Sequence, residues 1–269
     1  MSFEPAALPA RLLAADDCSA ARLEDAGLTS SQPPQQVIYD GWLLRFSPGK
    51  AKRARSVNAI GAGLVPLQDK LRHVESFYRR AHLPCLFRMT PFTQPRELDR
   101  TLDGAGYLAC DESRVMAVDL PVATDATSVG ASEIVDAQRF AQVVGRLRGS
   151  TAAVIAAEAQ RIVSASLPAR YRTVSEDGEP VACGCVVIDD RFAGLFNMVT
   201  AVARRGRGLA TALVAQLLRD AADVGARVAY LQVDAANSAA RHVYRKFGFR
   251  DRYAYWYRIH PDDRGESRC

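Results

Sequence analysis

The stretch ARRGRGLAT, residues 203–211, decides how the second half of this 269-residue chain is interpreted. It places three arginines and two glycines ahead of a run in which leucines recur with helical spacing, which predicts the start of a helix. Backbone N–H groups in the first turn of a helix have no intrahelical partner, and the helix dipole adds partial positive charge there. Because glycine also lets a ligand approach the backbone closely, the stretch predicts a pyrophosphate site over residues 206–211.

Two other interpretations of this stretch stay open at the level of the motif. It is compatible with a solvated basic turn. It also comes near the dinucleotide-binding pattern G-x-G-x-x-G, with Gly206, Gly208 and Thr211 in place and Asp234 following a later strand. That pattern normally opens a domain, whereas three strands precede the loop here. A nucleoside triphosphate loop is excluded because no Gly-Lys-Ser/Thr sequence follows.

The segments around the loop predict an α/β fold of the α+β type, with a mixed, mostly antiparallel central sheet flanked by helices. Residues 136–149 and 151–166 have helical apolar spacing. Residues 170–200 contain three alternating segments separated by the turn signals Asp177-Gly178 and Asp189-Asp190, which predict two hairpins. After the loop, the predicted order is helix, buried strand, helix and a final strand over 249–259.

A second motif follows the loop and, together with it, indicates a family. The loop has the form Arg-x-x-Gly-x-Ala, and the downstream helix carries Asn-x-x-Ala, then a tyrosine, then Gly-Phe. From about residue 130 to 258 the chain therefore resembles the GNAT superfamily of acyl-CoA N-acyltransferases. The residues that carry the resemblance are Arg205, Gly208, Ala210, Asn237, Ala240, Tyr244, Gly248 and Phe249.

The resemblance implies that acetyl-CoA is the cosubstrate. It implies that backbone groups of the strand before the loop bind the pantetheine arm, that N–H groups of the loop bind the pyrophosphate, and that an asparagine contacts the cofactor arm. A cap of the following helix is the other role for that asparagine. The implied cofactor-binding residues are Met198, Val199, Thr200, Arg205, Gly206, Arg207, Gly208, Leu209, Ala210, Thr211 and Asn237.

The resemblance also implies an N-acetyltransferase in which a primary amine attacks the thioester directly in a ternary complex. Tyr244 matches the tyrosine that donates a proton to the departing thiolate, a role suited to a phenol. The central-strand positions where relatives place a catalytic glutamate hold Gln232 and Asn197, and neither amide is a base. Water, Asp234 or a group from the first half is left to accept the proton. A non-catalytic acyl-CoA-binding or regulatory module is the alternative function, and a dinucleotide-binding enzyme is a further one.

The first half repeats this order of elements in weaker form. Strand patterns over 39–47 and 53–60, a helix over 66–81, and a strand, helix and strand up to residue 120 predict a tandem duplication. The segment GAGLVPLQDKL, residues 61–71, stands where the phosphate loop would lie. We therefore expect a degenerate GNAT-like domain over 1–122 and an acetyl-CoA-binding one over 129–269, joined by the Pro- and Gly-containing segment 119–132.

Composition and net charge limit the classes of ligand and partner that we expect. The net charge is +5 and the hydrophobic fraction 48%, typical of a globular protein that suits anionic ligands without requiring nucleic acid. The basic run 48–56 is interpreted as a solvated loop. Six cysteines and four histidines show no metal-ligand spacing, and reduced cysteines are expected. With no leader or membrane-span pattern, we expect a cytoplasmic monomer or homodimer acting on a small-molecule or peptide amine, without nucleic acid or membrane.

Overall fold

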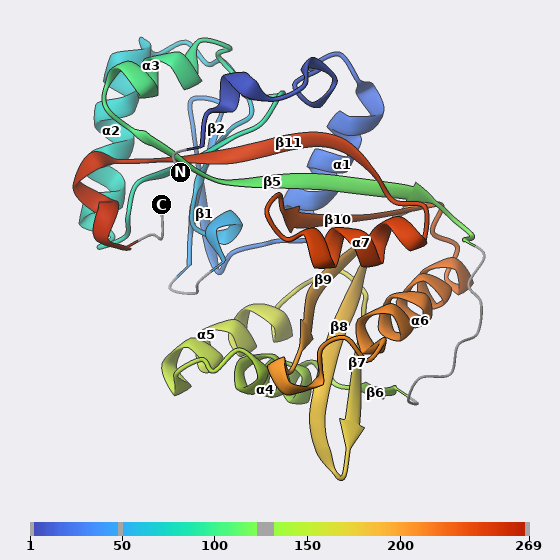
Figure 1. Ribbon diagram of the computed structural model, residues 1–269. Helices are drawn as coiled ribbons and strands as arrows, with labels where there is room; N and C mark the ends of the chain where they lie inside the picture. Colours follow the sequence, from blue (N-terminus) through green and yellow to red (C-terminus); the bar gives the residue numbers. More distant parts are fainter. Residues whose placement is uncertain (1–2, 48–50, 123–131, 267–269) are drawn as a thin grey trace.

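The computed structural model describes residues 3–47, 51–122 and 132–266, and the strands of these segments form one sheet of eleven (Figure 1). The helices are α1 (Cys18–Thr29), α2 (Leu67–Arg80), α3 (Leu98–Gly104), α4 (Ala137–Leu147), α5 (Ala152–Val163), α6 (Leu209–Asp223) and α7 (Ser238–Lys246). The strands are β1 (Gln35–Tyr39), β2 (Trp42–Phe46), β3 (Val57–Ala59), β4 (Leu86–Met89), β5 (Leu108–Asp119), β6 (Glu133–Val135), β7 (Ala169–Glu176), β8 (Glu179–Asp189), β9 (Phe192–Thr200), β10 (Val228–Asp234) and β11 (Arg250–Ile259).

The two halves of the chain have the same order of elements. In each half, two hairpin-connected antiparallel strands lead to a third strand, a helix and a fourth strand parallel to the third; these are β1 to β4 with α2, and β7 to β10 with α6. The mixed, mostly antiparallel sheet confirms the predicted fold class. It lacks the all-parallel order expected of a dinucleotide-binding fold.

The last strand of each half is exchanged into the other half's part of the sheet. The sheet order is β1-β2-β3-β4-β11-β5-β10-β9-β8-β7-β6. Thus β5 pairs with β10 from Asp119↔Val228 to Ser113↔Asp234, while β11 pairs with β4. The two halves therefore share one continuous sheet. Where one domain ends and the next begins stays a prediction, because residues 123–131 of the predicted junction lie outside the described part of the chain.

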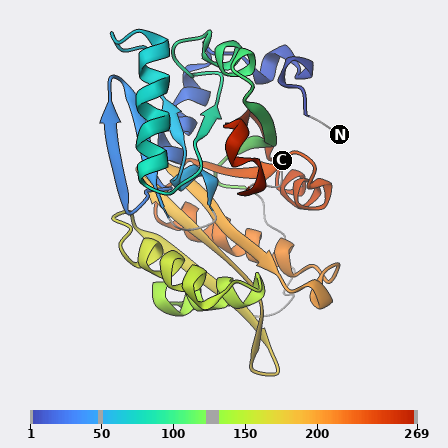
Figure 2. The same cartoon turned by 90° about the vertical axis from the view of Figure 1, so that its left-hand side faces the viewer.

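Helices cover both faces of the sheet (Figures 1 and 2). Side chains alternate between the two faces along a strand. On β8, Val186 accordingly packs in a core cluster with α6 and α7, whereas Cys185 packs in one with α4 and α5. Phe196 of β9 contacts both the α4–α5 cluster and the cluster formed by α1. Helices α1, α4 and α5 therefore lie on one face of the sheet, and α6 and α7 lie on the other.

Most of the predicted elements are present, with four local differences. The hairpin over 35–46 bends at Asp40-Gly41, where both residues have positive φ, so the strand expected over 39–47 is two strands. The turn after β8 lies one residue later than expected, at residues 190–191, with Asp190 at φ 53°. Strand β6 and helix α1 had no clear sequence signal. Cys110 is disulfide-bonded, so the expectation of reduced cysteines is wrong for this residue.

Candidate active site

The central feature of the site is the divergence of β9 from β10. The two strands are paired in parallel from Phe192↔Val228 to Leu195↔Leu231, and both continue beyond that point without further pairing to each other. The register between β8 and β9 shifts at this level, and Asn197 has φ 53°, which is the geometry of a bulge. A bulge bends its strand, so β9 turns away from β10 and leaves a gap through the sheet.

A cavity of about 520 Å³ occupies this gap. Met198, Asn237 and Tyr244 line it from the side of the predicted cofactor site. Helices α4 and α5 line it on the opposite face, and the first half contributes residues 30–32, 51, 53 and 54. The cavity therefore connects the two faces of the sheet, and residues from both halves of the chain form its walls.

Backbone groups of β9 face this gap. The N–H of Ala201 donates to the carbonyl of Val181 on β8, at 2.8 Å. Because a trans peptide directs its N–H and C=O in opposite directions, the carbonyl of Thr200 points away from β8, toward the gap. By the same alternation the carbonyl of Met198 faces the gap, whereas the backbone groups of Val199 face β8. Two of the three residues predicted for the pantetheine arm thus offer it backbone groups.

The loop after β9 has the geometry expected of an anion site. Gly206 and Gly208 have φ of 78° and 81°, and Gly208 is the N-cap of α6 with no side-chain cap. The N–H groups of Leu209, Ala210 and Thr211 have no hydrogen-bond partner within the described part of the chain. Around them the loop side chains are exposed. The predicted pyrophosphate-binding residues therefore lie together at an uncapped, positively polarised helix end: Arg205, Gly206, Arg207, Gly208, Leu209, Ala210 and Thr211.

Asn237 and Tyr244 lie on one helix beside the gap. The Oδ1 atom of Asn237 accepts a hydrogen bond from the N–H of Ala240 at 3.0 Å, so this residue caps α7 while it lines the cavity. Tyr244 is 8% exposed and its ring packs edge-on against Phe249. Burial raises the pKa of Tyr244 to about 12. Its phenol is therefore protonated at neutral pH and can donate a hydrogen bond into the cavity.

The two amides predicted at the base positions are both engaged by arginines. Arg53 donates to the Oε1 atom of Gln232, and Arg148 donates to the Oδ1 atom of Asn197 at 3.0 Å. The Nε2 atom of Gln232 lies so close to α1 that a Cβ added at Gly27 would come within 2.7 Å of it. A guanidinium thus binds the oxygen of each amide, whereas the Nε2 atom of Gln232 is buried without a hydrogen-bond partner among the described residues. Neither amide has a basic atom for the amine proton.

Sequence reasoning missed four charged residues of the cavity wall. Arg53 was expected in a solvated loop, but it is half-buried and lines the cavity; Lys50 of the same basic run lies outside the described residues. Arg148, Glu158 and Arg161 line the cavity from α4 and α5. Glu158 pairs with Arg161 at 2.7 Å, with side chains 12% and 15% exposed. The sequence predicted the helices α4 and α5, but no local signal showed which of their polar residues would meet a gap in the sheet.

In the first half, an internal carboxylate occupies the place that corresponds to the phosphate loop. The carboxylate of Asp40 accepts hydrogen bonds from the N–H groups of Leu64 and Val65, at 2.8 and 2.9 Å, and pairs with Lys70 at 2.8 Å. These hydrogen bonds lower the pKa of Asp40 to about 2. The N–H groups of Leu64 and Val65, in the loop that leads to α2, are therefore already bound by a carboxylate of the chain itself.

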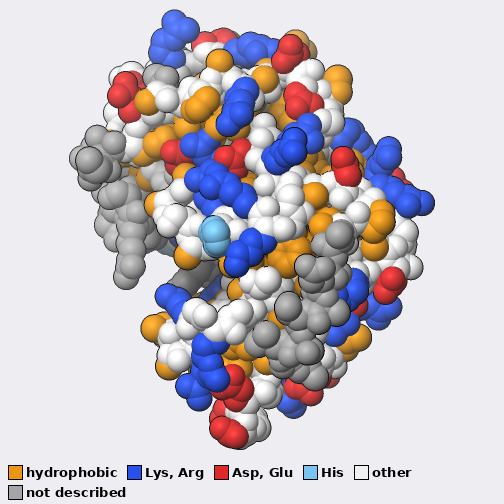
Figure 3. Space-filling model, turned by 45° about the vertical axis from the view of Figure 1, so that its right-hand side comes forward, with side chains coloured by type: hydrophobic (Ala, Val, Ile, Leu, Met, Phe, Trp, Pro, Cys, Tyr) orange, Lys and Arg blue, Asp and Glu red, His pale blue; other side chains and the backbone are white. Residues whose placement is uncertain are grey.

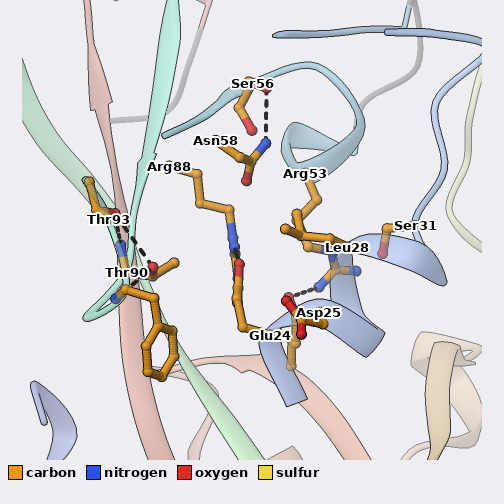
Figure 4. Close-up of polar contacts among 12 residues, drawn as sticks. Glu24, Asp25, Leu28, Ser31, Arg53, Ser56, Asn58, Arg88, Thr90 and Thr93 are labelled. Carbon is orange, nitrogen blue, oxygen red and sulfur yellow. Dashed lines mark hydrogen bonds and ion pairs between the residues drawn. The ribbon is translucent and has the colours of Figure 1, made fainter. Parts of the chain in front are cut away.

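The gap between β3 and β4 in the first half is also filled (Figure 4). These strands pair only at Val57↔Phe87 and Asn58↔Arg88. At the end of this pairing, Arg88 of β4 forms a buried ion pair with Glu24 of α1, and the hydroxyl of Tyr253 donates to Glu24 at 2.6 Å. A cavity of only about 100 Å³ remains beside the pair. The first half thus lacks both the open loop and the open gap of the second half.

Charge on the surface is distributed rather than concentrated. On the face that Figure 3 shows, Lys and Arg side chains are spread among acidic and uncharged ones. Among the residues that the structure describes, no three His, Cys, Asp or Glu side chains are grouped so as to hold a metal ion. None of the helices in the described ranges is long and apolar enough to span a membrane.

Comparisons with known proteins agree with this geometry. Residues 149–249 match the family model described as Acetyltransferase (GNAT) family. No curated protein matches the chain. Among solved structures, a GCN5-related N-acetyltransferase from Kribbella flavida has a TM-score of 0.64 at 18% identity, with 90% of this chain and 95% of that chain covered.

Two further structures extend the likeness over both halves. A GCN5-related N-acetyltransferase from Sphaerobacter thermophilus has a TM-score of 0.59 at 17% identity, covering 96% of this chain and 94% of its own. A tandem GNAT protein from the clavulanic acid biosynthesis pathway has a TM-score of 0.55 at 16% identity, covering 71% and 69%. At these identities the likeness establishes the fold.

Proposed function

Because residues 149–249 match the model of the GNAT acetyltransferase family, we propose that the protein transfers an acetyl group from acetyl-CoA to a primary amine. The observation that carries this proposal is the cavity between β9 and β10. Met198 of β9, the strand that leads to the uncapped start of α6, lines the cavity together with Asn237 and Tyr244, while α4, α5 and the first half line its other side. A cofactor and an acceptor entering from opposite faces would meet in the gap.

The cofactor's position follows from the chain's own donors and acceptors. The pyrophosphate would accept hydrogen bonds from the N–H groups at the start of α6, where the helix dipole favours an anion. The amide groups of the pantetheine arm would pair with the free backbone groups of Met198 and Thr200 on β9, and Asn237 would contact the arm from α7. This path leads the thioester toward Asn197 and Tyr244, both of which line the cavity.

The chemical step is direct attack in a ternary complex. The neutral amine nitrogen attacks the thioester carbonyl, the carbon–sulfur bond breaks, and the amine gives up one proton while the sulfur leaves. Tyr244 would donate a hydrogen bond to the sulfur. Since the pKa of Tyr244 is about 12, above that of a thiol at about 8.5, stabilisation of the developing thiolate is favoured over complete proton transfer.

Two carboxylates line the cavity and are the candidates to receive the amine proton, directly or through water. Glu158 pairs with Arg161 at 2.7 Å, so a guanidinium already occupies part of its carboxylate. Asp234 is exposed at the end of β10, and its Oδ1 accepts from the N–H of Ala236 at 2.8 Å. We propose Asp234 because it lies two residues beyond Gln232, on the same face of β10. No carboxylate from the described part of the first half lines this cavity.

A non-catalytic acyl-CoA-binding module is the second candidate. The observation in its favour is that both central-strand positions hold amides, Gln232 and Asn197, each bound by an arginine. Incubation with acetyl-CoA and a broad panel of amines separates the two functions. The enzyme releases free thiol in step with an acetylated product, detected by mass spectrometry, whereas the module binds acetyl-CoA and releases none above the rate without protein.

A further inference from the structure

Arg53 brings a positive charge from the first half of the chain into the cavity. It lies in the short 3-10 helix Lys52–Ala54, and its guanidinium is 5.5 Å from the centre of the Phe196 ring. One of its nitrogens donates to Gln232, the first residue of β10 beyond the paired segment. Arg53 is thus held at the point where β9 and β10 begin to diverge.

Arg148 brings a second positive charge to the same level from the opposite wall. It follows the end of α4 and donates to the Oδ1 atom of Asn197 at 3.0 Å. Asn197 and Phe196 are adjacent on β9, so the two arginines contact neighbouring residues of one strand. Each guanidinium has five N–H donors, and each has one side-chain acceptor in the described part of the chain.

No carboxylate in the described part of the chain pairs with either of these two charges. The acidic residues that line the cavity are Glu158 and Asp234. Glu158 pairs with Arg161, and Asp234 accepts from a backbone N–H of its own turn. Among the described residues, no ion pair involves Arg53 or Arg148. A neutral amide oxygen accepts a hydrogen bond from a guanidinium N–H but does not compensate the positive charge of the guanidinium.

These arginines are poorly placed to serve the cofactor's phosphates. They contact Gln232 and Asn197, close to the point where β9 and β10 begin to diverge. The N–H groups suited to the pyrophosphate lie beyond Thr200, the last residue of β9. The loop there has exposed arginines of its own at 205 and 207. The two guanidinium charges therefore face the part of the cavity that is lined by α4, α5 and the first half, where the acceptor would enter.

On the basis of the proposed acetyl transfer, we propose that the acceptor is an amino carboxylic acid, whose carboxylate is bound by Arg53 and Arg148 while its amine faces the thioester. Guanidinium binds carboxylate with two parallel N–H···O hydrogen bonds, which orients the ligand as well as holding it. Two unbalanced positive charges repel an acceptor that carries only ammonium groups. A carboxylate on the acceptor pairs with the two guanidinium groups and so removes this repulsion, close to the amine that must lose its proton.

The test compares matched acceptors that differ only in charge. Amino acids and their primary carboxamides are assayed with saturating acetyl-CoA, together with aliphatic diamines. The acids are expected to have kcat/KM at least about tenfold above their amides. Arg53→Gln and Arg148→Gln are each expected to raise KM for the acids by about tenfold or more while changing KM for acetyl-CoA less than twofold. The preference for acid over amide then collapses.

Arg139→Gln is the control, because this exposed arginine of α4 pairs with Glu133 outside the cavity. It should keep the wild-type preference, and the melting temperature of each variant shows that it is folded. Equal or faster acetylation of amides or diamines overturns the inference and leaves the acetyltransferase function standing. If acetyl-CoA does not bind, the proposed function itself fails.

If the protein binds acetyl-CoA but acetylates no acceptor of the panel, a binding measurement tests the carboxylate site instead. The melting temperature of the protein saturated with CoA is measured in the presence of each acid and each amide. A rise in melting temperature with acids alone, lost in Arg53→Gln, supports the carboxylate site. No difference between acids and amides overturns it.

Discussion

Arg53, in the first half of the chain, donates a hydrogen bond to the side-chain oxygen of Gln232 on β10 of the second half. The contact joins residues 179 positions apart and lies at the inner end of the cavity. The half that lacks a usable phosphate loop thus forms a wall of the chamber and contributes a charge to it. The first half would in this way influence which acceptor the proposed acetyl transfer uses.

Tyr244→Phe tests the role of the phenol. It removes one hydroxyl from a buried ring and should lower kcat by about a hundredfold with little change in the affinity for acetyl-CoA. Because the pKa of Tyr244 is about 12, its ionisation should cause no loss of rate up to about pH 10. Tyr39→Phe, at a half-exposed ring stacked on His73, is the control. An unchanged kcat would remove Tyr244 from the mechanism.

Ala210→Glu tests the anion site separately from folding. Position 210 is the second residue of α6, where a carboxylate interacts favourably with the helix dipole but repels a pyrophosphate. Affinity for acetyl-CoA, measured by calorimetry, should fall by more than about tenfold while the melting temperature is kept or raised. Ala153→Glu, at the second residue of α5, is the matched control and should leave the affinity unchanged. Equal affinity in both variants would contradict the site.

Asp40→Asn tests the internal carboxylate of the first half. The folded-state pKa of Asp40 is about 2, below the ordinary 3.8, so its charge stabilises the fold above about pH 4, and this stabilisation is lost as the pH falls toward 2. The variant should melt at a lower temperature than the wild type at pH 7, and the difference should shrink through that window. Asp69→Asn, at an exposed ion pair with Arg72, should show neither effect. A difference independent of pH would contradict this account.

Arg88→Met tests the buried ion pair in the filled gap. The change leaves the Glu24 carboxylate buried without its partner and should lower the free energy of unfolding by about 3–5 kcal/mol, measured by urea denaturation. Combining it with Glu24→Leu removes the stranded charge, so the double variant should be more stable than Arg88→Met alone. A double variant that is still less stable than Arg88→Met would show that the pair itself, rather than the unpaired charge, dominates.

The sequence predicted what depends on neighbouring residues. Gly206 and Gly208 ahead of a leucine-spaced segment identified the uncapped start of α6, and Asn237 identified the start of α7. The turn signal Asp177-Gly178 placed the first hairpin of the second half. In each case the information lies within a few residues, since caps, turns and periodicity are local properties.

What the sequence did not reveal depends on contacts between distant segments. The sequence patterns of β5 and β11 predict strands but do not indicate which half of the sheet each strand joins, so they do not show the exchange. Arg53 lies in a basic run typical of a solvated loop, and only tertiary packing brings it to Gln232. Asp40 belongs to a turn, and nothing local indicates that its carboxylate fills the loop before α2.

The most direct measurement is a calorimetric titration of the whole chain with acetyl-CoA, with NAD titrated in parallel. The account predicts one acetyl-CoA bound per chain, because the loop before α6 is open and the corresponding loop of the first half is filled by Asp40. Two sites per chain would contradict the assignment of the first half. No binding of acetyl-CoA, or tighter binding of NAD, would contradict the central claim.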